Sequence, residues 1–391
     1  MKIAIFSDSV SPIINGVSVS IDQLVQELRD LGHSVYIFGP YVDQSAESDP
    51  NVYRFRSLRL PWSKGVPVAF PPYLRTLRLF RRHKFDVIHT HTIGTISFVG
   101  LRWAQSHEIP IVATYHTLYD RYTHYFPVLP KRYVRFKIAK HTNYVFNRVD
   151  QIITPSEVAK RWLLRHSIER PITVIPTRIR PAKVNNRSEV RQKFGIAPHQ
   201  KVMLFVGRLA EEKNMETLLR ACSEAMSQNQ DLRLWIVGDG PYSNVCHATA
   251  RRLGIGDKVK FVGFVPRDEV DNYYAMADFF VFASVTETQG LVVQEAMAYG
   301  LPPAMVEGGG ASVGVIHGKN GLLTGNNPQQ LASAMLRLAT DDDLYFKLSE
   351  EAKRTARDCI QTSMAEQVLQ VYQAAISSSH VKEEAYDVVV S

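Results

Sequence analysis

Short apolar segments alternate with helical segments along almost the whole chain, and this alternation restricts the fold more than any other feature. In the first half, the segments typical of buried strands are 2–6, 35–38, 87–89, 111–115, 151–154 and 173–175. In the second half they are 202–206, 232–237, 259–262 and 279–282. Strands that alternate with helices form parallel sheets with helices on both faces. The sequence therefore predicts an α/β protein with two doubly wound parallel sheets, which bind ligands at the carboxyl ends of their strands.

The length of 391 residues exceeds what one ordinary core supports, so we expect two domains. The polar stretch 180–200 contains two prolines and is the expected linker, which assigns residues 1–180 and 181–361 to the two domains. Residues 1–180 hold 25 Lys and Arg against 13 Asp and Glu, whereas the remainder is acidic overall. This asymmetry indicates an anionic partner for the first domain, either nucleic acid or an anionic membrane surface.

Two stretches in the first half are candidates for a membrane contact. An apolar loop at 60–72 precedes a basic amphipathic helix at 73–84, a pattern typical either of an interfacial contact or of a core helix with a solvated basic face. The stretch 131–148 is also rich in aromatic and basic residues. Neither stretch carries an RNA-binding signature or a helix-turn-helix pattern, so we expect no nucleic acid.

The remaining composition favours a cytoplasmic protein. The three cysteines are odd in number and widely spaced, which predicts neither a disulfide framework nor a zinc site. No apolar run approaches the roughly 20 residues that a spanning helix needs, and the first residues form a strand rather than a signal peptide. Histidines 89, 91, 116 and 124 follow separate strands without the helical spacing of metal ligands, so we expect no metal there.

A loop that runs into a short helix at 286–302 is the strongest candidate for a ligand site. Gly300 suits a left-handed helix end, and Pro302 blocks continuation of the helix. The backbone near Gln289, Gly290 and Leu291 would lie at a positive helix end, where a phosphate is stabilised. Glu287 and Glu295 flank this helix start. Spacing alone leaves open whether they bind sugar hydroxyls or are a capping acid and a solvated acid.

Other strand ends carry groups that suit an anion. Arg208 and Lys213 follow the strand 202–206, where they would either clamp a diphosphate or remain solvated surface cations. Gly16 lies just before the helix expected at 18–31, either as a simple turn residue or as a point where a phosphate approaches the backbone. A strand-end histidine such as His116 suits an acceptor contact or proton transfer.

Five motifs in this order resemble the retaining family 4 glycosyltransferases. They are Asn15-Gly16-Val17, Gly207-Arg208 with Lys213, Gly238-Asp239-Gly240-Pro241, Phe261-Val262-Gly263-Phe264, and Glu287 followed eight positions later by Glu295. The resemblance implies the GT-B fold, in which two Rossmann-like doubly wound parallel-sheet domains face a cleft. It also implies that a helix at about 362–380 crosses back onto the first domain, and we expect the polar tail after 377 to be frayed.

The resemblance further implies a role for each matching residue. The expected catalytic residues are His116, Glu287, Arg208 and Lys213. His116 would lie between donor sugar and acceptor, and the two cations would neutralise the leaving phosphates. The expected donor-binding residues are Gly16, Arg208, Lys213, Phe264, Val265, Glu287, Thr288, Gln289, Gly290, Leu291 and Glu295. Because protein cations take the place of a metal ion, and no Asp-x-Asp arrangement stands at a strand end, we expect metal-independent transfer without a cofactor.

The segments 86–92 and 114–125 are similar to those of bacterial 1,2-diacylglycerol 3-glucosyltransferases. This narrower likeness implies hexose transfer, from UDP-glucose, to a lipid acceptor such as diacylglycerol. The enzyme would then lie peripherally on the inner face of the cell membrane. The alternatives are a phosphatidylinositol mannosyltransferase, a transferase with a soluble acceptor, a nucleotide-sugar 2-epimerase and a non-catalytic membrane-binding module.

Overall fold

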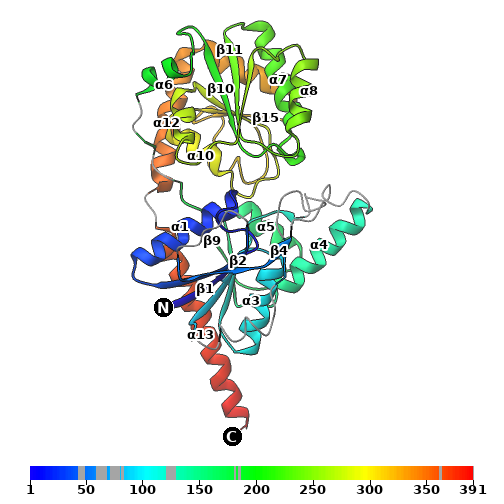
Figure 1. The fold of residues 1–391 in the computed structure, drawn as a ribbon, viewed down its shortest axis with the longest axis vertical. Helices are drawn as coiled ribbons and strands as arrows, with labels where there is room; N and C mark the ends of the chain where they lie inside the picture. The colour runs from blue at the N-terminus through cyan, green and yellow to red at the C-terminus, as the bar shows by residue number, and fades with distance from the viewer. Residues whose placement is uncertain are drawn as a thin grey trace. The chain divides into compact units, whose positions relative to one another are not determined.

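The computed structural model describes residues 1–42, 49–58, 68–70, 80, 83–119, 129–179, 182–183, 186–360 and 363–390. The chain divides into two compact units (Figure 1). The amino-terminal unit comprises Met1–Arg178 and Ser363–Ser391, and the carboxy-terminal unit comprises Ile179–Thr362.

A parallel sheet forms the centre of the amino-terminal unit, in the order β3-β2-β1-β6-β7-β8-β9. Its strands are β1 (Lys2–Phe6), β2 (Ser34–Pro40), β3 (Val52–Phe55), β6 (Val87–Thr90), β7 (Ile111–Thr114), β8 (Gln151–Thr154) and β9 (Ile172–Val174), and β4 (Ser57–Leu58) pairs with β5 (Val68–Ala69) separately. The helices are α1 (Gly16–Asp30), α3 (Thr95–Ser106), α4 (Lys131–Phe146), α5 (Glu157–Arg165) and α13 (Met364–Val390). Apolar clusters pack on both faces of this sheet, and the central strand β1 is accordingly apolar from Ile3 to Phe6.

A second parallel sheet, in the order β12-β11-β10-β13-β14-β15, forms the centre of the carboxy-terminal unit. Its strands are β10 (Lys201–Val206), β11 (Leu232–Val237), β12 (Val259–Gly263), β13 (Phe279–Phe282), β14 (Pro303–Val306) and β15 (Leu322–Thr324). The helical segments are α6 (Arg187–Lys193), the 3₁₀ turn η3 (Glu211–Lys213), α7 (Met215–Gln228), α8 (Ser243–Arg252), α9 (Val270–Met276), α10 (Leu291–Ala298), α11 (Pro328–Thr340) and α12 (Asp342–Ile360).

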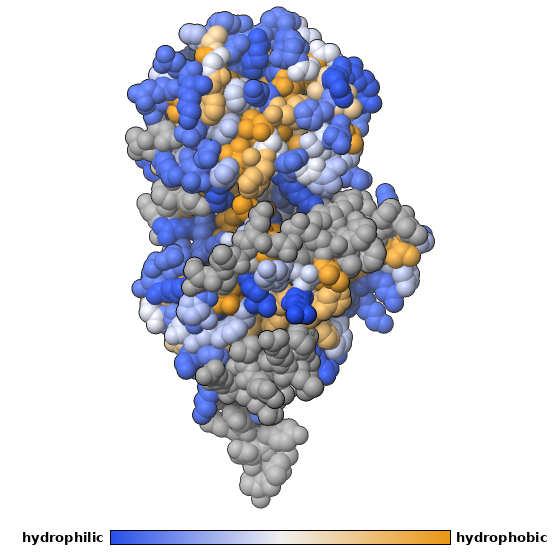
Figure 2. Space-filling model, viewed as in Figure 1, coloured by the Kyte–Doolittle hydropathy of each residue, from blue (hydrophilic) through white to orange (hydrophobic). Residues whose placement is uncertain are grey.

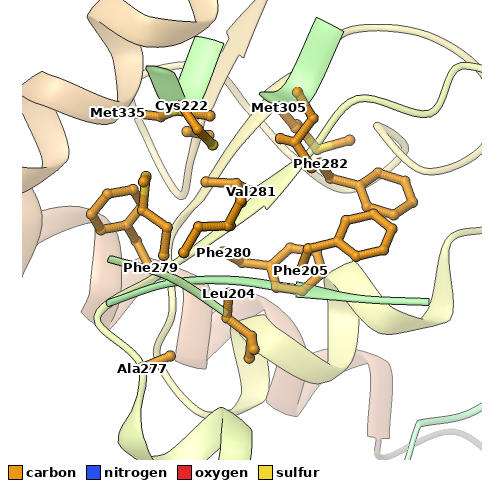
Figure 3. Close-up of a cluster of buried hydrophobic side chains, with 14 of the residues drawn as sticks. Leu204, Phe205, Cys222, Ala277, Phe279, Phe280, Val281, Phe282, Met305 and Met335 are labelled. Atoms are coloured by element: carbon orange, nitrogen blue, oxygen red, sulfur yellow. The ribbon is translucent and has the colours of Figure 1, made fainter. Parts of the chain in front are cut away.

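Figure 3 shows the apolar centre of the second sheet, where side chains of β10 and β13 interdigitate with those of the helices. Phe205 and Phe282 stack with ring centroids 5.8 Å apart. All four residues of β13 are buried. The ends of β10 and β13 are therefore held rigidly, and the loops that follow them start from fixed points. At the surface, Figure 2 shows mainly hydrophilic side chains on this unit in the view drawn.

The structure confirms the two doubly wound parallel sheets and corrects several details. β14 was not expected, because Pro302 was taken as the residue that blocks continuation of the preceding helix. Pro303 is the first residue of the strand, where its missing N–H is tolerated. The tail after 377 continues as α13 to Val390 instead of fraying. The stretch 180–200 lies in the carboxy-terminal unit, as in the expected division at residue 180, and Arg187 and Arg191 of α6 join it to that unit by pairing with Asp278.

Several expected features lie outside the described residues. These are most of the apolar loop at 60–72, most of the basic helix at 73–84, and His124. The segment 114–125 is described only as far as residue 119.

Candidate active site

Each sheet reverses its strand order at one point, and the expected site residues follow the strands that meet there. β1 lies between β2 and β6, and β10 lies between β11 and β13. The order reverses between β1 and β6 in the first sheet and between β10 and β13 in the second. At such a point the connections from the two neighbouring strands run to opposite sides, which leaves a binding crevice at the carboxyl ends of these strands. Arg208 follows β10 directly, and the loop with Glu287 follows β13. The topology thus brings these two segments together at the carboxyl ends of β10 and β13, which are neighbours in the carboxy-terminal sheet.

Lys213 and Glu287 form an ion pair at these strand ends, although 74 positions separate them in the sequence. Their side chains are 15% and 18% exposed. Ser284 donates a hydrogen bond of 2.9 Å to the same carboxylate oxygen of Glu287. Burial by itself would raise the pKa of Glu287, but Lys213 and the Ser284 hydroxyl outweigh it and lower the pKa below its usual value. Glu287 is therefore a carboxylate at neutral pH.

Asn214 holds the Lys213 turn against the end of β13. Its backbone is left-handed, with φ of 55°, which is a conformation that asparagine tolerates. Its side-chain amide donates to the carbonyl of Ala283 at 3.1 Å and to Asn326 at 2.9 Å. Asn214 and Ser284 were not predicted as site residues, because Asn214 meets Ala283 and Asn326 only in the folded chain, where Ser284 bonds to Glu287.

The start of α10 lies beside this pair and has no side-chain cap among the described residues. Gly290 precedes the helix with φ of 74°. The amide groups of the first turn are therefore oriented outward at the positive end of the helix, as an anion site requires. This is the arrangement that the sequence predicted near Gln289, Gly290 and Leu291, and Gly300 likewise ends the helix with φ of 75°.

A glycine-rich loop at 308–310 packs against the segment 286–290. Gly310 donates its N–H to the carbonyl of Glu287 at 2.5 Å. A Cβ at Gly310 would lie 1.8 Å from the carbonyl oxygen of Thr288, and one at Gly290 would lie 2.6 Å from Ala311. Only glycine fits this close approach, and the run Gly308-Gly309-Gly310 is the feature of the sequence that indicates it.

Glu295 lies further along α10 and has two partners that the sequence did not reveal. Arg267 contacts one carboxylate oxygen at 2.7 Å, and the Tyr274 hydroxyl donates to the other at 3.0 Å. Phe264, which is 62% exposed, follows Gly263 of β12, and the half-buried Val265 comes after it. These residues come from three segments of the carboxy-terminal unit.

In the amino-terminal unit, Gly16 is the first residue of α1 and not a residue before it. The Asn15 side chain caps the helix by accepting from the amides of Val17 at 3.0 Å and Ser18 at 3.1 Å. A Cβ at Gly16 would meet nothing within 4 Å. Gly16 thus borders open space, but two amides of this helix start are already bonded.

His116 follows β7 and lies against His91, which follows β6. The Nδ1 of His91 and the Nε2 of His116 are 2.9 Å apart. Burial lowers the pKa of His116 to about 4, and burial with the neighbouring histidines lowers the pKa of His91 well below its usual value. Both rings are therefore neutral at physiological pH. No group of three or more His, Cys, Asp or Glu that could hold a metal ion occurs in the part of the chain that the structure describes.

Two protein families match the two halves of the chain. Residues 14–183 match the family described as Glycosyltransferase Family 4, and residues 186–355 match the glycosyl transferases group 1. The chain is 33% identical to an alpha-monoglucosyldiacylglycerol synthase of Streptococcus pneumoniae, over 77% of this chain and 70% of the relative. It is 31% identical to the enzyme of the same name from Acholeplasma laidlawii, over 90% and 92% of the two chains.

The fold also matches a solved structure, Anabaena Alr3699/HepE in complex with UDP-glucose. The TM-score is 0.78 with 21% sequence identity, over 96% of this chain and 100% of the other.

Proposed function

Because this chain belongs to the family 4 glycosyltransferases, of GT-B fold, we propose that it moves a glucosyl group from UDP-glucose to the free hydroxyl of 1,2-diacylglycerol at a membrane surface. The observation that carries the proposal is 31% identity over 90% of the chain to a relative named for this glucolipid product. The arrangement of the carboxy-terminal site supports the donor half of the reaction. An exposed helix of the amino-terminal unit supports the lipid half.

The chemical barrier is departure of the nucleoside diphosphate from the anomeric carbon, with negative charge growing on the leaving oxygen. Lys213, Arg208 and the uncapped start of α10 all place positive potential at one edge of the carboxy-terminal sheet. Groups that are oriented in advance toward such charge typically accelerate reactions by about 10²–10³ each. We assign to them the stabilisation of the leaving diphosphate.

The two acidic residues would bind sugar hydroxyls of the donor. Glu287, held ionised by Lys213 and Ser284, would accept hydrogen bonds from hydroxyls of the transferred glucose. Glu295, oriented by Arg267 and Tyr274, would accept them from the ribose. Phe264 and Val265 would contact the uracil. A nucleophilic role for Glu287 is disfavoured, because Lys213 and Ser284 already bond to one of its carboxylate oxygens.

We propose retention of configuration at the anomeric carbon. The bond from this carbon to the phosphate oxygen breaks, and a bond to the acceptor oxygen forms on the same face. The proton of the acceptor hydroxyl passes to the leaving phosphate. His116, being neutral, would contact the sugar and the acceptor by hydrogen bonding without adding a charge that repels the developing oxocarbenium ion.

Helix α4 supports the membrane contact. It carries no acidic residue and five basic ones, Lys131, Arg132, Arg135, Lys137 and Lys140, all exposed. Tyr133 and Phe136 lie on the same segment, 49% and 61% exposed, and Figure 2 shows apolar side chains next to hydrophilic ones in this region. Each basic residue near an anionic bilayer contributes about 1 kcal/mol, and aromatic side chains favour the interface.

No helix of the described residues is both long and apolar enough to cross a bilayer. We propose α4, of the two stretches considered from the sequence, as the contact, because its basic and aromatic side chains are exposed. The combined change Phe136→Ser, Lys137→Glu and Lys140→Glu should reduce sedimentation with phosphatidylglycerol vesicles at least tenfold. A matched change in the other unit, Arg251→Glu with Arg252→Glu in α8, should not. Equal vesicle binding by the two variants would contradict the assignment.

The test of the function is a transfer assay with UDP-glucose and diacylglycerol in vesicles, with products identified by mass spectrometry. The expected product is monoglucosyldiacylglycerol with the α configuration. Lys213→Ala should reduce turnover by about 10²-fold or more while vesicle binding stays intact. Transfer only to phosphatidylinositol or to a soluble sugar would overturn the acceptor. Conversion of a UDP-sugar without any acceptor would indicate a 2-epimerase.

A further inference from the structure

We propose that Tyr372, on the carboxy-terminal helix α13, is a positioning residue that fixes the ring of His116 through His89 and His91. The proposal rests on the proposed function only for the role of His116 in transfer. The arrangement of the four side chains stands on the structure of the amino-terminal unit itself.

The chain of contacts begins at α13. The Tyr372 hydroxyl lies 2.7 Å from Nδ1 of His89, and the Thr114 hydroxyl lies 2.7 Å from Nε2 of the same ring. His89 is therefore held at both nitrogens. Tyr372 and His89 are both 0% exposed, so water does not compete for these bonds.

The second step is packing between rings. The His89 and His91 rings lie with centroids 3.9 Å apart, and His91 is 1% exposed. The His91 ring makes one hydrogen bond, between Nδ1 and Nε2 of His116, while its own Nε2 is buried and has no partner within the described part of the chain. Because one bond does not fix a ring plane, the orientation of His91 depends on the His89 ring against which it packs.

The third step concerns protons. A nitrogen-to-nitrogen distance of 2.9 Å holds one hydrogen atom, so only one of the two facing atoms, Nδ1 of His91 or Nε2 of His116, is protonated. The tautomers of the two rings are thus coupled. Burial lowers the pKa of both rings and keeps them uncharged at neutral pH, so the two rings do not repel each other electrostatically.

A small cavity of about 10 Å³ borders the histidines, which is about the space that one water molecule needs. It is lined by His91, His116, Ser20 and Thr177, and by Met364 and Val368 of α13. The helix that ends the chain therefore supplies both the wall of this cavity and the hydroxyl that selects one orientation.

The decisive experiment compares Tyr372→Phe with wild type by two readouts. Long-range ¹H–¹⁵N spectra of the histidine-labelled full chain report the tautomer of each ring without any activity. We expect one fixed tautomer for His91 and His116 in wild type, and averaged signals in the variant. In the transfer assay, kcat should fall about tenfold with the KM for UDP-glucose within twofold, as expected when positioning is lost but the donor site is intact.

Tyr53→Phe is the matched control, because the Tyr53 hydroxyl also contacts a histidine of this unit, Nε2 of His83 at 3.1 Å. It should leave both readouts unchanged. His91→Asn, which keeps a polar atom near the position of Nδ1, should retain more kcat than His91→Leu. If Tyr372→Phe does not fold, His89→Gln serves instead, since it keeps the contact to Thr114 and removes the one to Tyr372.

Unchanged tautomer signals in Tyr372→Phe and in His89→Gln would overturn the proposal. So would equal losses of kcat in Tyr372→Phe and Tyr53→Phe. If wild type transfers no sugar, the proposed function fails, whereas the spectra still decide whether Tyr372 fixes the ring of His116.

Discussion

Lowering the pH from 7 to 5 should destabilise the amino-terminal unit, because this unit buries uncharged histidines. Burial, with a smaller effect of the neighbouring His116, lowers the pKa of His89 to about 3, and burial lowers that of His116 to about 4. In the unfolded chain, both have the ordinary value of about 6.5. Below pH 6.5 the unfolded state therefore binds more protons than the folded state, and the free energy of unfolding falls as the pH falls.

The loss of free energy of unfolding between pH 7 and pH 5 depends little on how far below 5 the pKa of each histidine lies in the folded chain. Between pH 7 and pH 5, a histidine that is protonated only in the unfolded chain lowers the free energy of unfolding by about 2 kcal/mol. His89 and His116 together account for about 4 kcal/mol, and His91 acts in the same direction. The three histidines of the carboxy-terminal unit, His199, His247 and His317, are all exposed, so this unit buries no histidine.

Urea unfolding at pH 7 and pH 5, followed by tryptophan fluorescence, measures this loss. In a Trp235→Phe background, the other three tryptophans all belong to the amino-terminal unit. His89→Gln should reduce the pH-dependent loss by about 2 kcal/mol, whatever its stability at pH 7. His141→Gln, at an exposed position, should keep the wild-type loss. Equal losses in His89→Gln and wild type would refute the reasoning.

Three further predictions concern the carboxy-terminal unit. Gly310→Ala, whose Cβ would lie 1.8 Å from the carbonyl of Thr288, should weaken UDP binding at least tenfold by calorimetry, whereas Gly256→Ala, with its nearest contact at 3.6 Å, should not. Asp278→Asn breaks a buried pairing with two arginines and should destabilise the unit by about 3 kcal/mol, measured as faster labelling of the buried Cys222 thiol. EDTA should leave turnover unchanged, because protein cations neutralise the leaving phosphates; abolished turnover would contradict this assignment.

Much of the fold was predictable because its signals are local. Buried parallel strands are short apolar runs, and four of them were predicted with the bounds that the structure has: Lys2–Phe6, Gln151–Thr154, Leu232–Val237 and Phe279–Phe282. The strand at Pro303–Val306 was missed because Pro302 was taken as a local break signal, whereas its pairing with β13 depends on residues distant in the sequence. The length of α13 was missed for a related reason, since a polar composition was taken to indicate a frayed tail.

For the site, the sequence determined which functional groups are present and which strands they follow. It supplied the cations, the acids Glu287 and Glu295, and the helix start between them, because strand ends and helix caps are set by neighbours in the chain. Only the tertiary structure decided the partners. Lys213 meets Glu287 across 74 positions, and His89 meets Tyr372 across 283. Such pairs follow from the strand order at each sheet's reversal point and from the path of the last helix, and no local pattern of residues encodes either.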